Sequence, residues 1–231
     1  MSEATQLKAM PVLEAMQSRR SVRAFLGTSI DKKVITQILE AASRAPSGTN
    51  MQPWKTYVLT GSSLADLCET VSDAFDKRPT GYDSEMRYYP EQWFEPYKTR
   101  RRKIGLDLYG LLDIKKGDKQ RMHEQHRRNF LFFNAPVGCI FTIDRNLATG
   151  SWLDYGMFLQ NIMLAARTFG LDTCPQAAWA DFHPAIRTQM SLPDNEIVVC
   201  GMAIGHSDPE APENQLQTER APLQENTCFL E

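Results

Sequence analysis

The sequence predicts an α+β fold, in which a mixed, mainly antiparallel sheet of four or five strands is wrapped by helices. Two observations favour this class: amphipathic helical stripes and short apolar, β-branched segments occur along the same chain. The chain has 231 residues, of which 42% are hydrophobic and 23% are charged. This length and composition suit a single globular domain covering residues 1–231, with one sizeable core.

The first part of the chain shows two helices separated by a strand. Apolar residues at helical spacing after Asp31 predict a helix that is buried on one face and stopped by Pro46. Residues 56–60 predict a short strand. Ser62 or Ser63 is expected to cap the next helix. The buried stripe of that helix would consist of Leu64, Leu67, Val71 and Phe75.

Residues 78–118 are the least regular part of the sequence, and we predict that they leave the core as an insertion. Aromatic residues alternate there with charges and are followed by the basic run at 98–103. Beyond the insertion, residues 137–143 are continuously apolar and β-branched, which is typical of a central strand buried on both faces. Residues 151–169 predict a nearly all-apolar core or interface helix that ends at Gly170, where a left-handed cap is easy.

The last third of the chain completes the sheet and then changes character. Residues 172–177 and 197–204 predict two more strands, with a helix at about 182–190 between them. Residues 206–231 are polar and contain prolines, so we predict an extension that needs a surface to lie against. No internal repeat and no second domain are visible.

Charge and cysteine content limit the classes of function. The formal net charge of −2 gives no global reason to expect a polyanionic partner, so affinity for phosphate must come from local clusters. Five cysteines at scattered spacings, without a Cys-x-x-Cys pair, indicate reduced thiols. No secretory signal and no apolar run of roughly 20 residues is seen. We therefore expect a cytoplasmic protein without a membrane partner.

The first candidate site is the cluster Arg19, Arg20, Ser21 and Arg23, which follows a short helix predicted from about Val12. Three guanidinium groups and a hydroxyl group can bind a phosphate and a polarised ring in fork geometry, where lysines would act only as point charges. The alternative is a solvated basic helix end.

The second candidate site is the turn-rich passage at 45–54, Ala-Pro-Ser-Gly-Thr-Asn-Met-Gln-Pro-Trp. Its Ser, Asn and Gln side chains can make directed hydrogen bonds at the edge of a site. Taken alone, the passage is simply a loop.

Together with two later segments, these motifs resemble the FMN-dependent nitroreductase family. The segment at 170–179, Gly-Leu-Asp-Thr-Cys-Pro-Gln-Ala-Ala-Trp, is similar to the one that these enzymes place beside the isoalloxazine ring. The sequence Arg-Ala-Pro-Leu at 220–223 resembles their C-terminal phosphate-contacting arginine. The four motifs occur in family order and extend from Arg19 to Leu223, so the resemblance covers almost the whole chain. It is greatest to the branch of nitrobenzoate-type reductases.

The resemblance implies a role for each matching residue. Arg19, Arg20, Ser21 and Arg220 would bind the FMN phosphate, and Arg23 would stabilise negative charge on N1 and O2 of the reduced ring. Pro175, Gln176, Ala177 and Ala178 would lie against the ring, with a backbone N–H of Ala177 or Ala178 directed at N5. The remaining contacts would come from Pro46, Ser47, Asn50 and Gln52, the first two across a dimer interface.

The resemblance also implies the chemistry and the assembly. NADH or NADPH would reduce FMN, and the substrate would then take the place of the nicotinamide in a ping-pong reaction that needs no dedicated catalytic residue. The absence of a Gly-x-Gly-x-x-Gly motif suits a family that docks the nicotinamide directly over FMN. We expect a nitroreductase-like homodimer, with an interface along the helix at 155–166 and a domain-swapped C-terminal tail.

Three readings of the substrate are open. Trp93, Phe94 and Tyr97 would stack on a small aromatic substrate, while the arginines at 100–102 attract a carboxylate; the alternative is an amphipathic helix covering the dimer surface. The main hypothesis is reduction of a nitro group to a hydroxylamine. Reductive dehalogenation of halophenols is the runner-up, and a non-catalytic protein that binds nucleic acid through residues 98–103 is a remote third.

No metal site is predicted. His123 and His126 are three residues apart on a predicted helix, a spacing that can ligate zinc, but no further ligands can be identified. The neighbouring charged and amide residues favour a solvated helix face.

Overall fold

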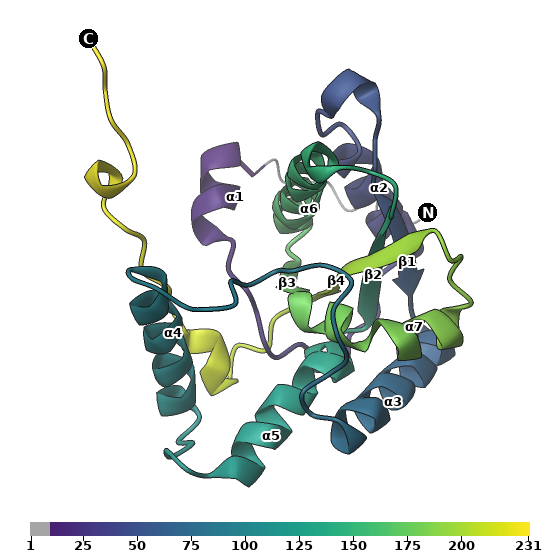
Figure 1. Ribbon diagram of the computed structural model, residues 1–231, viewed down its shortest axis with the longest axis vertical. Coiled ribbons are helices and arrows are strands. Elements are labelled where there is room, and N and C mark those ends of the chain that lie inside the picture. The colour runs from purple at the N-terminus through teal and green to yellow at the C-terminus, as the bar shows by residue number, and fades with distance from the viewer. Residues whose placement is uncertain (1–9) are drawn as a thin grey trace, which may run out of the picture.

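A four-stranded antiparallel sheet with strand order β1-β2-β4-β3 lies at the centre of the molecule (Figure 1). The computed structural model describes residues 10–231. The strands are β1 (Lys55–Leu59), β2 (Val137–Asp144), β3 (Asp172–Gln176) and β4 (Glu196–Gly205). The helices are α1 (Val12–Ser18), α2 (Lys32–Ala42), α3 (Gly61–Lys77), α4 (Tyr97–Leu111), α5 (Lys119–Arg127), α6 (Thr149–Thr168) and α7 (His183–Met190). Short 3₁₀ helices are formed by Gly48–Asn50, Arg128–Asn134, Ala177–Phe182, Pro212–Gln215 and Leu223–Glu225.

The α+β class is confirmed, but the prediction of a mixed sheet needs correction. All three pairs of neighbouring strands are antiparallel. The one parallel pairing between described residues is the isolated bridge from Ser21 to Thr173, which lies outside the named strands. The pairing is limited to this one bridge, and a few residues later the chain forms a second isolated bridge, from Phe25 to Ser207, which is antiparallel.

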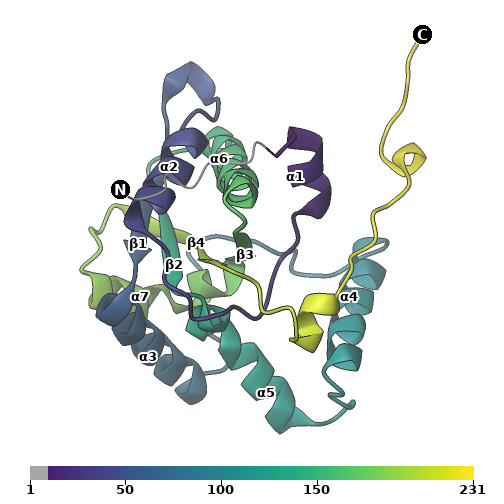
Figure 2. The ribbon, with the colours of Figure 1, turned by 180° about the vertical axis from the view of Figure 1, so that it is seen from behind.

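Helices cover both faces of the sheet and create two hydrophobic cores. Figures 1 and 2 show α1, α2 and α6 on one face, and α3, α5 and α7 on the other. The alternation of β2 serves both cores: Val137, Cys139 and Phe141 face the α2 and α6 side, while Ile140 faces the α3 and α7 side. The predicted burial of this strand on both faces is therefore confirmed.

The start of α2 agrees with the sequence, whereas the start of α3 does not. Asp31 caps α2, because its carboxylate accepts a hydrogen bond from the backbone N–H of Lys33 at 2.8 Å. Neither Ser62 nor Ser63 caps α3, because the helix begins earlier and Thr60 is its N-cap residue. Gly61 has a φ of +54°, a backbone conformation that glycine adopts without strain, and this lets the chain turn directly from β1 into the helix.

The helix α6 and the cap after it agree with the prediction. Its buried side chains include Tyr155, Phe158 and Ile162, and it is followed by Gly170 with a φ of +70°. By contrast, Leu153 is 72% exposed. This helix therefore has an apolar surface beyond what the core covers.

The insertion and the C-terminal extension lie next to each other at one side of the molecule. The insertion carries α4, none of whose residues is buried. The extension is buried on its own chain as far as Leu216, which is 7% exposed, and then runs outward past α4, to which exposed ion pairs connect it (Figures 1 and 2). Between residues 10 and 231, no helix has both the length and the hydropathy to cross a membrane.

Candidate functional site

The arginine-rich segment after α1 is held in an extended conformation beside β3. The backbone N–H of Val22 donates to the carbonyl of Thr173 at 3.1 Å, and the side chain of Val22 is buried. Since side chains alternate along extended backbone, Ser21 and Arg23, the residues before and after Val22, both point away from the core. Both are half-buried. The segment thus presents polar side chains next to β3.

Three of the predicted phosphate ligands line one cavity of about 680 Å³. Arg19 and Arg20 reach it from the end of α1, and Arg220 reaches it from the C-terminal extension. Burial lowers the pKa of Arg19, and the nearby guanidinium of Arg220 lowers it further. Arg167, also in the lining, is neutralised by Asp172 at 2.5 Å. The cavity therefore has surplus positive charge carried by guanidinium groups, which suits a phosphate.

Arg23 is held by a buried polar cluster that sequence reasoning missed. The side-chain oxygen of Asn214 accepts from the backbone N–H of Arg23 at 2.8 Å, and its amide nitrogen donates to the carbonyl of Ala24 at 2.8 Å. Arg128 donates to the carbonyl of Arg23 at 3.1 Å and pairs with buried Glu213. The single available signal was the basic and acidic character of residues far apart in the chain, which does not identify partners.

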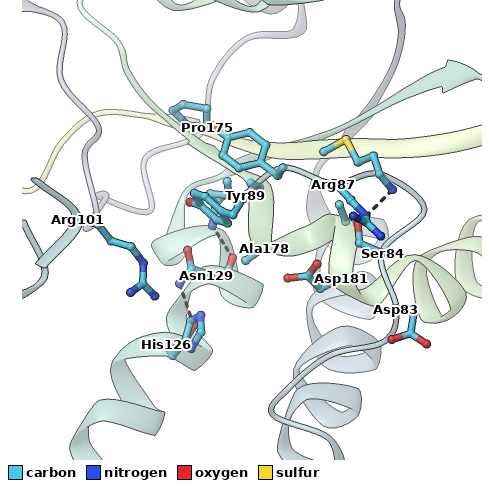
Figure 3. Close-up of a pocket in the computed structure, with 15 residues that line it drawn as sticks. Asp83, Ser84, Arg87, Tyr89, Arg101, His126, Asn129, Pro175, Ala178 and Asp181 are labelled. Carbon is cyan, nitrogen blue, oxygen red and sulfur yellow. Dashed lines mark hydrogen bonds between the residues drawn. The ribbon is translucent and has the colours of Figure 1, made fainter. Parts of the chain in front are cut away.

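Two larger cavities, of about 840 and 760 Å³, meet at the end of β3. Pro175, Gln176 and Ala177 line both, and Ala178 lines the larger one (Figure 3). Gln176 donates to the carbonyl of Asn129 at 2.6 Å, which leaves its side-chain oxygen buried without a partner among the described residues. The hydroxyl of Thr173 is unpartnered in the same way. Such groups are costly unless a partner satisfies them, so Gln176, which lines both cavities, suits a ligand with a hydrogen-bond donor.

Figure 3 shows what faces Pro175 and Ala178 across the larger cavity. Tyr89 lies close to Pro175, with Arg101 on one side and Asp181 on the other. Burial raises the pKa of Asp181, although His183 acts against this effect.

The predicted substrate residues do not line the cavities at β3. Trp93 contacts Tyr89, with ring centroids 5.2 Å apart, and Phe94 packs edge-on against Tyr97 at 5.1 Å. None of these three predicted residues lines the two cavities at β3, whereas Tyr88 and Tyr89 do. Direct stacking of Trp93, Phe94 and Tyr97 on a substrate stays a prediction.

The turn between α2 and β1 lies apart from the arginines in the single chain. It sits against α6, where the backbone N–H of Gly48 donates to Asp154 at 3.0 Å. Ser47 accepts from the backbone N–H of Gln52 at 3.0 Å, and Asn50 and Gln52 have left-handed backbone conformations. Pro46, Asn50 and Gln52 are exposed. The structure therefore does not bring this turn to the other predicted ligands within one chain.

The two histidines of α5 have other contacts. His123 hydrogen-bonds to Asp76 at 2.9 Å and stacks on Phe75, which also packs against His126. Within residues 10–231, no group of three or more potential metal ligands comes together.

The sequence model of the nitroreductase family matches residues 16–206, which span the arginine segment, the whole sheet and the cavities at β3. The chain belongs to the nitroreductase family.

Similar members of the family include reductases of nitroaromatic compounds. The chain is 41% identical to a nitrobenzene nitroreductase of Ectopseudomonas oleovorans, over 94% of this chain and 96% of the relative. It is 43% identical to a 4-nitrobenzoate reductase of Pseudomonas putida, over 92% of each. Among solved structures, the FMN- and NADPH-dependent nitroreductase NfnB from Sphigopyxis sp. strain HMH superposes with a TM-score of 0.93 and 36% identity, over 96% of this chain and 100% of that chain.

Proposed function

We propose that this nitroreductase family member binds FMN and uses NADH or NADPH to reduce nitroaromatic compounds to hydroxylamines. One observation carries the proposal: Arg19, Arg20 and Arg220 converge on one cavity, and the side-chain oxygen of Gln176, at the end of β3, is buried without a partner among residues 10–231. The names of the similar reductases agree with this activity.

The phosphate end of FMN would be held by Arg19, Arg20, Ser21 and Arg220. The pKa of Arg19 is lowered mainly by burial and further by the positive charge of Arg220, and a bound anion would offset both effects. Because Arg220 arrives from the C-terminal extension, it closes the cavity over a ligand bound to the helix end.

The ring end would lie against Pro175, Gln176, Ala177 and Ala178. When bound, FMN supplies the hydride chemistry that no side chain here can perform. Arg23 provides a fixed positive charge next to β3; together with Arg19 it offsets part of the rise in the pKa of Cys174 that burial causes. No general acid or base is assigned, and protons can come from solvent.

A homodimer would complete the site, with Pro46, Ser47, Asn50 and Gln52 contributed by the partner subunit. An exposed apolar surface on the adjacent helices α1 and α6 supports this assembly. It consists of Val12, Leu13, Met16, Leu153 and Met157. The end of the extension is also apolar and exposed, with Leu230 92% accessible, and it fits a tail that extends over the partner.

Residues 78–118 would act as a lid segment over the ring, and residues 206–231 as the C-terminal extension of a single domain. Tyr88 and Tyr89 would meet a small aromatic substrate, with Trp93, Phe94 and Tyr97 supporting or extending the stack.

The function is tested on the purified full-length protein. We expect a yellow protein whose flavin absorbance is bleached by NADH or NADPH and restored by a nitroarene. A colourless protein that cannot be reconstituted with FMN would overturn the proposal. Restoration by a halophenol but not by a nitroarene would replace nitro reduction by dehalogenation.

The phosphate cavity is tested by Arg19→Gln. Losing a charge-assisted hydrogen bond is worth about 1.5–3 kcal/mol, so the Kd for FMN should rise about 10- to 100-fold. The Kd is measured by titrating the apoprotein with FMN. Arg102→Gln, an exposed change of the same kind on α4, should leave the Kd unchanged; equal effects of both variants would contradict the assignment.

A further inference from the structure

The basic run on α4 divides into residues that hold the C-terminal extension and one that faces the cavity at β3. Arg100 pairs with Glu225 at 2.9 Å, and Lys103 reaches Glu219 at 3.4 Å as well as Asp107 at 2.7 Å. Arg101 alone of this run lines the larger cavity. Its guanidinium lies 4.8 Å from the ring centre of Trp93, and no carboxylate among residues 10–231 pairs with it.

The other groups in the lining leave Arg101 as the unpaired cation of the cavity. Arg87 is paired with Glu91. Burial lowers the pKa of His126, and His123 acts in the same direction, so this imidazole is neutral at pH 7. Figure 3 shows Arg101 on the same side of Tyr89 as His126 and Asn129.

The negative groups lie at the opposite end. Figure 3 places Asp181 and Asp83 on the far side of Tyr89 from Arg101. The wall of the cavity is therefore polarised, with a positive end at α4 and a negative end toward α7. An aromatic ligand that carries an anionic group experiences attraction at one end and repulsion at the other.

We infer that Arg101 is a specificity-determining residue that selects nitroarenes bearing a carboxylate or a similar anionic group over neutral nitroarenes. The inference rests on the proposed function and deepens it. The planar guanidinium binds a carboxylate through two parallel hydrogen bonds. Its contact with Trp93 holds the guanidinium plane in place before the substrate arrives, which reduces the entropy cost of binding.

This assignment gives Trp93 a definite part. The side chain acts on the substrate through Arg101 and Tyr89 rather than by direct contact. It is a positioning residue, and its aromatic face is the property that matters.

The test compares 4-nitrobenzoate with 4-nitrobenzamide, two acceptors of nearly equal size of which only the first is an anion. Each is assayed with the FMN-loaded enzyme at low ionic strength and saturating reductant. The wild-type enzyme should have the higher kcat/KM for 4-nitrobenzoate. Arg101→Gln should lower that kcat/KM about 10- to 100-fold, mainly through KM, and should change the value for the amide by less than about threefold.

Arg102→Gln is the matched control, because it removes the same charge from the next residue, whose side chain does not line the cavity. It should change neither substrate by more than about threefold. Arg101→Lys keeps the charge but loses the planar pair of donors, so this variant should retain only part of the preference for 4-nitrobenzoate over the amide. An equal loss of kcat/KM for 4-nitrobenzoate in the Arg101 and Arg102 variants would overturn the inference in favour of long-range attraction. An equal loss of kcat/KM for both substrates in Arg101→Gln would also overturn it, because the residue would then not distinguish the anion from the neutral compound.

The outcomes separate this inference from the proposed function. An FMN-loaded wild-type enzyme that reduces neither compound would refute the function. Reduction of both compounds with a preference that Arg101→Gln leaves unchanged would keep the function and refute the role of Arg101.

Discussion

Asn214 lies in the C-terminal extension, but its contacts place it among the residues that shape the site. Its side chain joins the N–H of Arg23 and the carbonyls of Ala24 and Asp208 in one cluster. The N–H of Arg23 would otherwise be left unpaired in a half-buried position. Asn214 would therefore act on the proposed flavin site through the backbone of Arg23.

Asn214→Ala should shift the reduction potential of bound FMN to a lower value and slow flavin reduction by NADH or NADPH. The reason is that Arg23, no longer fixed, stabilises the negative charge of the reduced ring less well. Stability should fall by about 1–3 kcal/mol, because paired buried groups become unsatisfied. The potential is measured by equilibrium dye titration. Gln215→Ala, at the exposed neighbour, is the control; a potential unchanged in Asn214→Ala would show a purely structural role.

Individual site residues could be predicted where the local sequence itself indicates their chemistry. Arg19, Arg20 and Arg220 were identified because guanidinium groups suit a phosphate and stand in recognisable motifs, and the structure brings them to one cavity. Asn214 and Arg128 were not predicted because each binds a backbone carbonyl that is distant in sequence, about 190 and 105 residues away, and Arg128 also pairs with the distant Glu213. Nothing in the local sequence encodes such a contact.

The end of the sheet contains a buried carboxylate shared between three strands. Glu196 begins β4 and accepts hydrogen bonds from Tyr57 at 2.8 Å and Thr142 at 2.6 Å, and it also pairs with Lys55. Burial by itself would raise the pKa of Glu196, but these partners outweigh burial and hold the pKa below its ordinary value of 4.5. The ionised form therefore stabilises the junction of β1, β2 and β4.

The free energy of unfolding should depend on the protonation of Glu196. Because its pKa is lower in the folded state, its contribution is complete above about pH 4.5 and is lost as the pH falls through the folded value. The free energy of unfolding is measured by urea denaturation between pH 3 and pH 7, a range set by this shift. With falling pH it should decrease more steeply in the wild-type protein than in Glu196→Gln. Parallel curves for the two proteins would rule out this source of acid sensitivity.

A glycine in the centre of β4 allows the 3₁₀ helix after β3 to pack closely. A Cβ atom at Gly201 would lie 2.4 Å from Cδ1 of Trp179, whose ring is fully buried. Gly201→Ala should therefore lower the free energy of unfolding by about 1–3 kcal/mol, measured by urea denaturation. Gly105→Ala on α4, where a Cβ meets nothing within 4 Å, should be neutral or stabilising. A neutral Gly201→Ala would mean that Trp179 moves away easily.

Elements with a strong period were predictable, and elements determined by packing were not. The apolar stripe of α2 fits only a helix and the apolar run of β2 fits only a buried strand, and both elements were predicted. The 3₁₀ helix Arg128–Asn134 requires left-handed conformations at Phe132 and Phe133, which local preferences oppose. Burial of both rings in the core compensates for that cost. The start of α3 was misplaced for a related reason: the conformation of Gly61 outweighed the capping preference of the serines.

At the scale of the whole molecule, the exposed apolar surface of α1 and α6 is the proposed dimer interface. Leu153→Glu, at a side chain that is 72% exposed, should dissociate the proposed dimer and reduce its FMN content, while the monomer keeps its helical circular dichroism. Mass is measured by light scattering after size-exclusion chromatography.

Leu106→Glu on α4, where the leucine is 59% exposed, is the matched control and should stay dimeric. A Leu153→Glu variant that remains a dimer with full FMN content would move the interface elsewhere.

The placement of the cysteines bears on how the protein withstands its own chemistry. Nitro reduction proceeds through a nitroso compound, an electrophile that reacts with thiolates, which are nucleophilic, rather than with thiols. Burial raises the pKa of Cys68 and Cys174 to about 11 and that of Cys139 and Cys200 to about 12. Cys174, directly before Pro175 at the cavity, is thus kept protonated beside the proposed site, where the nitroso intermediate would form. The fifth thiol, Cys228, is exposed at the far end of the extension, so self-inactivation should be confined to a residue that the active site can lose.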